Sequence, residues 1–180
     1  SAQRHGAWAF RSDGTAAGGV AIASTDAGWA STTQPLPQPV DYFDVSFTPE
    51  PGIPYRVWLR LKASADSKWN DSVWLQFSNA LVNGAPAYGI NSGNGLAINL
   101  EPCSNCGLSG WGWQDGAYWL ARPAVVFGSG GTQTLRIQTR EDGVSIDQIV
   151  ISAATWLSAA PGPPAGDSTI VPRSEPGASG

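Results

Sequence analysis

The sequence predicts an all-β fold, a sandwich or barrel of antiparallel strands, and three observations lead to that prediction. About ten short stretches of alternating apolar and polar residues recur at regular spacing. No window shows a sustained helical period of apolar residues. Glycine and proline, with 22 and 14 copies in 180 residues, are enriched in a way that suits many short strands joined by turns. The length is sufficient for one domain with its own core.

The clearest pattern lies in residues 54–78, and we expect the rest of the fold to be organised around it. Apolar residues at every second position give each of two strands an inward face. Between these strands, residues 63–71 are rich in Ser, Asp, Asn and Lys, as expected for a loop, and Trp69 lies near its tip. We therefore predict two long antiparallel strands paired as a hairpin. The inward set is Tyr55, Val57, Leu59, Leu61, Val73, Leu75 and Phe77.

The remaining strands are separated by turn sequences. Residues 41–48 alternate cleanly and predict a strand, and the proline-rich run before them predicts a loop or an edge segment. The runs NSGNG and GSGGTQ predict turns after the hairpin. The strands expected there are 87–90, 96–100, 117–121, 124–127, 134–139 and 144–152. Composition shifts to Pro, Gly and Ser near the end, so we predict a domain at 1–158 and a linker or tail at 159–180.

Charge and hydropathy exclude several partners. The net charge is −4, which argues against nucleic acid, whose binding needs a basic face. The two lysines, Lys62 and Lys68, cannot form a polybasic membrane patch. No apolar run approaches the roughly 20 residues that a bilayer span needs. The start of the sequence lacks the apolar region of a signal peptide, so we expect a mature or excised piece of something larger.

The two cysteines, Cys103 and Cys106, predict a small disulfide in a glycine-rich loop. No helical pattern follows them, as a redox motif would require, and His5, the one histidine, is too distant in sequence to complete a zinc site. Gly107 stands where a haem-attachment motif has histidine. A disulfide indicates an oxidising compartment, so we expect a secreted or cell-surface protein.

Three pieces of the chain resemble a known family. They are Ala17-Gly18-Gly19, Tyr55 followed five residues later by Arg60, and the closing run DGVSIDQIVIS at 142–152. In order and spacing they are similar to the jelly-roll carbohydrate-binding modules of the family 6, family 35 and malectin-like kind, over residues 6–157. The resemblance implies a two-sheet antiparallel β-sandwich, galactose-binding-like, with a non-catalytic sugar-binding role. It also implies, in many members, a structural calcium ion.

The functional residues of that family carry over only in part. Asp147 stands where the family has a calcium-binding Asp on its last strand. The acidic pair that the family places near its N-terminus is replaced by the run from Ala7 to Ala9. Ser145 stands where members often have a ligand-binding Asn. Calcium takes six to eight oxygen ligands, several of them carboxylate, so Asp147 is the one metal ligand that the resemblance implies.

Tryptophans in predicted loops give the first candidate site. A sugar presents an apolar C–H face and a rim of hydroxyls, so its site needs a flat aromatic platform with polar groups around it. Trp69, Trp111 and Trp113 all fall in predicted loops, where binding groups gather in a sandwich. The alternative is that each ring folds back as a lid over the core. The polar residues expected beside these three rings are Asn70, Asp71, Gln114, Arg140 and Glu141.

A second candidate surface is the polar face of the predicted sheet. One interpretation is that this face forms a groove for a longer glycan chain. The alternative is that loops cover the face and that its tryptophan rings pack on the aliphatic parts of the arginine side chains. Its members are Arg56, Trp58, Arg60, Trp74, Gln76, Arg136 and Gln138.

The function predicted from the sequence is non-catalytic binding of a polysaccharide by a module of a secreted, bacterial-type protein. A glycosidase needs two carboxylates across a cleft, and none of the acidic residues falls in a recognisable catalytic motif. An alternative of a different class is an extracellular assembly module that binds other domains or chains through the sheet face and the C-terminal tail.

Overall fold

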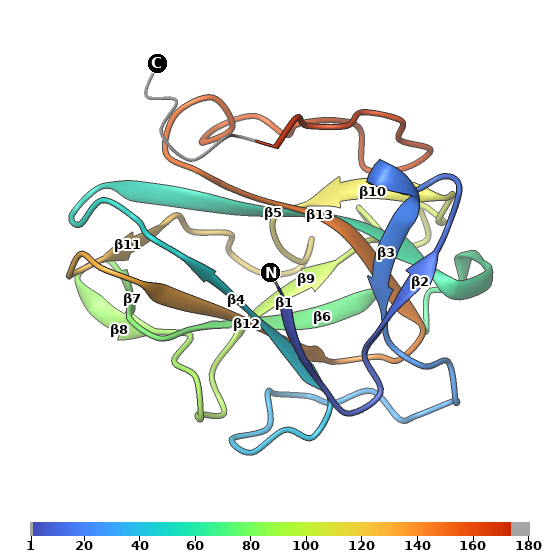
Figure 1. Ribbon diagram of the computed structural model, residues 1–180, viewed down its shortest axis with the longest axis horizontal. Coiled ribbons are helices and arrows are strands. Elements are labelled where there is room, and N and C mark those ends of the chain that lie inside the picture. Colours follow the sequence, from blue (N-terminus) through green and yellow to red (C-terminus); the bar gives the residue numbers. More distant parts are fainter. Residues whose placement is uncertain (1, 174–180) are drawn as a thin grey trace.

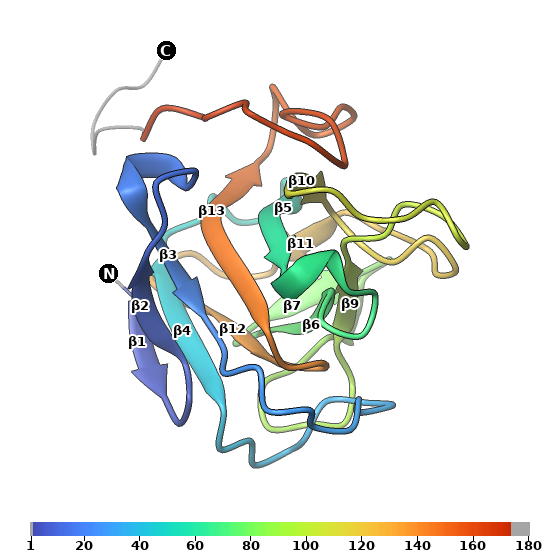
Figure 2. The ribbon, with the colours of Figure 1, turned by 90° about the vertical axis from the view of Figure 1, so that its right-hand side faces the viewer.

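The computed structural model describes residues 2–173 and has two antiparallel sheets that pack face to face (Figures 1 and 2). The predicted two-sheet sandwich is therefore confirmed. The five-stranded sheet has the order β1 (Ala2–His5), β4 (Tyr42–Phe47), β12 (Gln133–Thr139), β6 (Ser72–Phe77), β9 (Leu96–Asn99). The eight-stranded sheet has the order β2 (Ala9–Ser12), β3 (Val20–Ala23), β13 (Val144–Ser152), β5 (Pro54–Ala63), β11 (Val125–Phe127), β7 (Ala80–Val82), β8 (Ala85–Ala87), and β10 (Trp111–Gln114) also pairs with β5.

The core lies between the two sheets, as the alternating pattern predicts. Leu59 and Leu61 of β5 and Leu75 and Phe77 of β6 are fully buried there, each a side chain whose burial contributes about 1.5–3 kcal/mol. Their neighbours in the sequence point to the two outer faces. The described helices are two single 3-10 turns, η1 (Ala17–Gly19) and η2 (Ser64–Asp66), and none has the length or apolarity of a membrane span.

The predicted hairpin is wrong, because β5 and β6 belong to different sheets. β5 pairs with β13, with Leu59 opposite Ile149, and β6 pairs with β12, with Leu75 opposite Ile137. Residues 64–71 cross from one layer to the other. The alternating pattern predicts which face of a strand is buried, but it does not predict with which strand it pairs. The apolar faces of β5 and β6 do both contribute to one shared core.

Most of the other strands are confirmed, with two exceptions. The strands predicted at 41–48, 96–100, 124–127, 134–139 and 144–152 are present as β4, β9, β11, β12 and β13. Residues 117–121 form a turn, closed by the Leu120 amide on the carbonyl of Ala117 at 3.1 Å. Instead of a strand at 87–90, the pair β7 and β8 occupies 80–87. The sequence predicts that the cysteine loop continues through Trp111 and Trp113, and the structure instead has the strand β10 there.

The chain continues past β13 across the outer face of the eight-stranded sheet. This C-terminal segment, residues 159–171, lies over β5 and β10 at the top of Figure 1. Trp113 donates its amide to Pro163 O at 3.1 Å, and Asp167 donates its amide to Trp111 O at 2.7 Å. The segment is thus packed on the sandwich, and residue 158 is not where the packed chain ends. The remainder of the predicted tail, 174–180, lies outside the described residues.

Candidate functional site

Trp69 is presented to solvent on a firmly anchored loop. Its side chain is 68% exposed, with Lys68 Nζ 5.1 Å from the ring centroid. The loop follows the turn η2, and the next residue, Asn70, is buried. Asn70 Nδ2 donates to Asp142 O at 2.9 Å and to Asp26 Oδ1 at 3.1 Å, which ties the loop to two other loops. The loop that carries the exposed Trp69 ring is therefore held in a fixed position.

Two hollows meet at this ring. The first, the Trp29 hollow, has a volume of about 290 Å³ and lies between Trp69 and the loop that carries Asp26 and Trp29. Trp29 is 41% exposed. Its amide donates to Asp142 Oδ2 at 3.1 Å, and the Ala27 amide donates to the same oxygen at 2.6 Å. A buried carboxylate thus fixes the loop that carries the second exposed indole.

The second hollow, the Trp119 hollow, has a volume of about 190 Å³. Its aromatic wall consists of Trp69, Tyr118 and Trp119, and the last two pack edge to face with ring centroids 4.8 Å apart. Tyr118 and Trp119 are 40% and 47% exposed. The polar residues that line it are Lys68, Asp71, Asn99, Glu101, Ser104, Asn105, Arg140 and Glu141.

The polar floor of the Trp119 hollow is a connected network. Asp71 Oδ2 accepts from Asn99 Nδ2 and from the Glu101 amide, both at 3.2 Å. Glu141 Oε2 accepts from Ser72 Oγ at 2.6 Å, and Arg140 donates to Glu141 Oε1 at 2.9 Å. The Arg140 guanidinium also lies over the rings of Trp74 and Trp119, at 5.7 and 5.6 Å.

Burial and a neighbouring carboxylate keep a proton in this floor. Loss of solvent around Asp71 raises the pKa of its carboxyl to about 8, and the hydrogen bond and the charge of Glu141 add to this effect. The Asp71 amide also donates to Glu141 Oε2 at 3.3 Å, so the two acidic residues are in contact at the base of the hollow. With its pKa raised to about 8, the Asp71 carboxyl keeps its proton near neutral pH, and the pair holds one proton.

The structure brings together five of the eight residues predicted for the first candidate site. Trp69, Asn70, Asp71, Arg140 and Glu141 all line the two hollows. The charged turn 140–143 is largely buried at Glu141 and Asp142. Asp142 of this turn is hydrogen-bonded to the loop that carries Trp29 and to the loop that carries Trp69.

The other three predicted residues, Trp111, Trp113 and Gln114, are not part of this site. They form β10, and their exposed fractions are 3%, 1% and 5%. Trp111 Nε1 donates to Thr15 Oγ1 at 2.9 Å, and Gln114 donates to Leu100 O at 3.0 Å. The prediction that they line a binding loop is wrong, because β10 pairs with β5 and the C-terminal segment covers it.

The second candidate surface is wrong as a single face. Arg56, Trp58 and Arg60 lie on the outer face of the eight-stranded sheet, while Trp74 and Gln76 lie on the outer face of the five-stranded sheet. Arg136 and Gln138 of β12 accompany the latter pair. The seven residues therefore occupy opposite sides of the sandwich.

Both of these outer faces are covered by the chain itself. On one, Trp58 Nε1 donates to Trp156 O at 2.8 Å and Arg56 pairs with Asp115 at 2.7 Å. The other face is covered by loops. Three residues show this: Trp74 donates to Thr32 Oγ1 at 2.8 Å, Gln76 donates to Gly89 O at 2.9 Å, and Gln138 accepts from the Leu36 amide at 2.8 Å. Arg136 is engaged within the sheet, by two 2.9 Å bonds to Asp44 of the neighbouring strand β4.

Three aromatic residues of the hollows were missed by sequence reasoning. Tyr118 and Trp119 fall in an apolar run that reads as a short strand, and Trp29 reads as one of the apolar patches before residue 53. A neighbouring glycine does not provide the missing signal: Trp29 follows Gly28 and is exposed, but Trp111 and Trp113 also follow glycines and are buried.

The residues around Asp147 do not fit the calcium ion that the family resemblance implies. Asp147 Oδ2 accepts from Arg60 at 2.5 Å and from the Ala17 amide at 2.7 Å, and its Oδ1 is buried without a hydrogen-bond partner. Arg60 also binds Asp167, at 2.6 Å. A guanidinium thus supplies the positive charge beside Asp147. Among residues 2–173 no group of three or more acidic, histidine or cysteine side chains is arranged to hold a metal.

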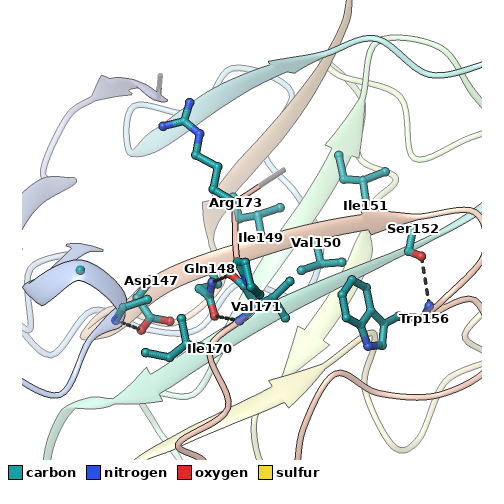
Figure 3. Close-up of a pocket in the computed structure, with 13 residues that line it drawn as sticks. Asp147, Gln148, Ile149, Val150, Ile151, Ser152, Trp156, Ile170, Val171 and Arg173 are labelled. Carbon is teal, nitrogen blue, oxygen red and sulfur yellow. Dashed lines mark hydrogen bonds between the residues drawn. The ribbon is translucent and has the colours of Figure 1, made fainter. Parts of the chain in front are cut away.

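A third hollow, about 840 Å³, lies along β13 beside the C-terminal segment (Figure 3). Its walls are mainly apolar. The polar groups are largely engaged: Gln148 holds the main chain of Val171 through bonds of 2.7 and 3.1 Å, and Ser152 Oγ accepts from the Trp156 amide at 3.1 Å. Exposed aromatic rings such as those of Trp69 and Trp119 are also not among the residues that line this hollow.

Comparisons with known proteins complete the description. No protein-family model matches the sequence, and no curated protein matches it significantly. A family 35 carbohydrate-binding module from Clostridium thermocellum aligns over 84% of this chain and 92% of its own, with 15% identity and a TM-score of 0.43. A cycloisomaltooligosaccharide glucanotransferase from Paenibacillus sp. aligns over 83% of this chain but 17% of its own, with 16% identity and a TM-score of 0.39. The chain is thus similar to solved structures that include a family 35 module, at a level that identifies no ligand.

Proposed function

We propose that this protein binds carbohydrate, without chemical turnover, at the loop surface around Trp69. The observation that carries the proposal is the 68% exposed indole of Trp69, held beside a polar floor by a buried anchor. Burial of a tryptophan of about 200 Å² contributes roughly 5 kcal/mol, so a ring held in water forgoes a large stabilisation. Contact with the apolar face of a sugar recovers it.

The surroundings of the ring support the same class of ligand. Hydroxyls need donors and acceptors at close range, and Asp71, Asn99, Glu101 and Glu141 line the hollow on one side of the ring. Their positions are fixed by bonds to one another and to main-chain amides. A preorganised floor keeps the entropic loss on binding small.

The contact between Asp71 and Glu141 supports a non-catalytic role. A glycosidase holds its two carboxyl groups about 5–9.5 Å apart, with a sugar or a water between them. Here Glu141 Oε2 accepts from the main-chain amide of Asp71 at 3.3 Å, and Glu141 raises the pKa of the neighbouring Asp71 carboxyl. Two acidic side chains this close to each other favour recognition of a glycan over its hydrolysis.

We also infer that the protein works outside the cytosol. Cys103 and Cys106 are disulfide-bonded, with Cα atoms 5.3 Å apart, and such bonds persist in oxidising compartments. The disulfide closes the loop that supplies Ser104 and Asn105 to the wall of the Trp119 hollow. A glycan-binding surface is consistent with that location.

Titration with soluble glycans tests the proposal. We expect a panel of gluco-, xylo-, manno- and galacto-oligosaccharides to contain a ligand detectable by calorimetry. Trp69→Ala should abolish its binding while leaving the unfolding temperature unchanged. Phe10→Ala, which removes a 54% exposed ring remote from both hollows, is the matched control. Lack of binding across the panel and across insoluble polysaccharides would overturn the proposal.

A further inference from the structure

We propose that the site at Trp69 takes a chain of at least two uncharged sugar units, which crosses the indole with one unit in each hollow. This inference rests on the proposed function and specifies its ligand. Trp69 and Glu141 line both hollows, so the two are contiguous and are not separate sites. A single sugar ring in either hollow would leave the other side of the Trp69 indole uncovered.

Each hollow has its own second aromatic residue. Trp29, 41% exposed, lies on one side of Trp69, and Trp119, 47% exposed, lies on the other. Three exposed indoles along one surface offer three apolar contacts, more than one sugar ring can use. Successive units of a glycan present successive apolar faces, which matches this arrangement.

The loops that carry these rings are tied to one another through the turn 140–143. Asp142 accepts from the amides of Ala27 and Trp29, and Asn70 donates to Asp142 O. Arg140, from the same turn, lies 5.6 Å from the Trp119 ring. The spacing between the hollows is therefore fixed before a ligand arrives, as a site for a chain of defined repeat requires.

The charges around the hollows favour a neutral chain. Asp26, Asp142, Glu101 and the proton-sharing pair Asp71 and Glu141 line them. The cations are fewer: Arg140 is committed to Ser72 and Glu141, and Lys68 lies over the Trp69 ring. A uronate carboxylate would face more negative than positive charge here, and its affinity would fall further at low salt.

The length dependence of affinity tests the proposal. Neutral oligosaccharides of one to six units, from the series that binds, are titrated against the wild-type chain. We expect affinity to rise about ten-fold between one unit and three, the gain of roughly one further aromatic contact. The corresponding uronic acid oligomers should bind at least about ten-fold more weakly than the neutral ones.

Variants in each hollow sharpen this test. In Trp29→Ala and, separately, in Trp119→Ala, the gain between one and three units should fall to less than about three-fold. Phe10→Ala should keep the full gain. Because Trp119 packs near Arg140, Trp119→Phe is included to keep a ring there, and it should retain part of the gain.

The outcomes separate this inference from the function on which it rests. If monosaccharide and trisaccharide bind equally, or if just one of the two outer tryptophans affects the longer ligand, the two-hollow arrangement is overturned while carbohydrate binding stands. Tighter binding of uronates than of neutral sugars overturns the charge preference. If no sugar of any length binds, both the proposed function and this inference fail.

Discussion

Arg60 Nε donates to Asp167 Oδ2 at 2.6 Å, although the two residues are 107 positions apart in the sequence. Arg60 Nη2 also donates to Asp167 O at 2.9 Å, and both side chains are almost completely buried. This pair joins the C-terminal segment to the centre of the eight-stranded sheet. The C-terminal segment, residues 159–171, is therefore a structural part of the sandwich.

Asp167→Ala should release the C-terminal segment. Removing one partner of a buried ion pair leaves the other partner uncompensated and typically destabilises a protein by about 3–5 kcal/mol. Arg60 keeps Asp147, so we expect the lower end of that range. Urea unfolding measures the loss, and proteolysis within 159–171 reports the release. Glu50→Ala, at an exposed residue, is the control and should change neither result. An Asp167→Ala chain as stable and as protease-resistant as the wild type would contradict this role of the pair.

Gly112→Ala should dislodge the same segment without touching a charge. A Cβ atom at Gly112 would overlap Pro164 O, and Gly112 has no positive φ that would strain alanine by itself. The substitution therefore acts by pushing residues 163–164 away from β10. We expect faster proteolysis of the segment and a lower unfolding temperature. Gly14→Ala is the matched control, because nothing lies within 4 Å of a Cβ placed there. Equal behaviour of the two variants would show that the segment does not need this close approach.

Asp71 should make the protein less stable as the pH rises. The pKa of its carboxyl is about 8 in the folded chain, against an ordinary value of 3.8, because burial and Glu141 disfavour its charge. Between these two pKa values the folded state holds a proton that the unfolded state has lost. The contribution of Asp71 to the free energy of unfolding is therefore fully present below about pH 4 and is lost as the pH rises through 8.

Asp71→Asn tests this by fixing the neutral state. The amide can accept from Asn99 and the Glu101 amide and can donate to Glu141, as the protonated acid does. We expect the variant to match the wild type at pH 4 and to exceed it above pH 8 by roughly 2–5 kcal/mol in unfolding free energy. Glu50→Gln should keep the wild-type slope. A wild-type slope in Asp71→Asn as well would rule out Asp71 as the titrating group.

The sequence predicts the strands of this fold better than their neighbours. The inward faces of β5 and β6 follow from alternation, because a core face must be apolar. Their separation into two sheets does not, since a polar loop suits a hairpin as well as a crossing between layers. The pairing of β5 with β13 depends on contacts between residues about 90 positions apart, for which the sequence carries no local signal.

The candidate site likewise has one part that the local sequence predicts and one part that depends on distant contacts. Trp69, with Lys68 and Asn70 beside it, reads as an exposed loop residue, and it is one. Trp111 and Trp113 read alike and are buried, because the segment that covers them begins nearly 50 residues later and has a composition typical of linkers. Whether a tryptophan is exposed depends on what folds over it, and that depends on distant residues such as Arg60 and Asp167.

Asn70→Ala should weaken glycan binding through the position of Trp69. The Asn70 side chain is buried and makes two hydrogen bonds, to Asp142 O at 2.9 Å and to Asp26 Oδ1 at 3.1 Å. Its removal leaves a buried carbonyl unpaired and frees the loop. We expect a loss of about 1–2 kcal/mol in unfolding free energy.

Binding of the best ligand from the oligosaccharide panel should fall several-fold in Asn70→Ala, because the loop must then be ordered when the ligand binds. Calorimetry should show a more unfavourable entropy with little change in the apolar area buried. Asn79→Ala is the matched control: it removes one side-chain hydrogen bond, to Ser129 Oγ at 2.7 Å, away from both hollows. If Asn70→Ala loses stability and binds the glycan as tightly as Asn79→Ala does, the anchor stabilises the fold but does not preorganise the site.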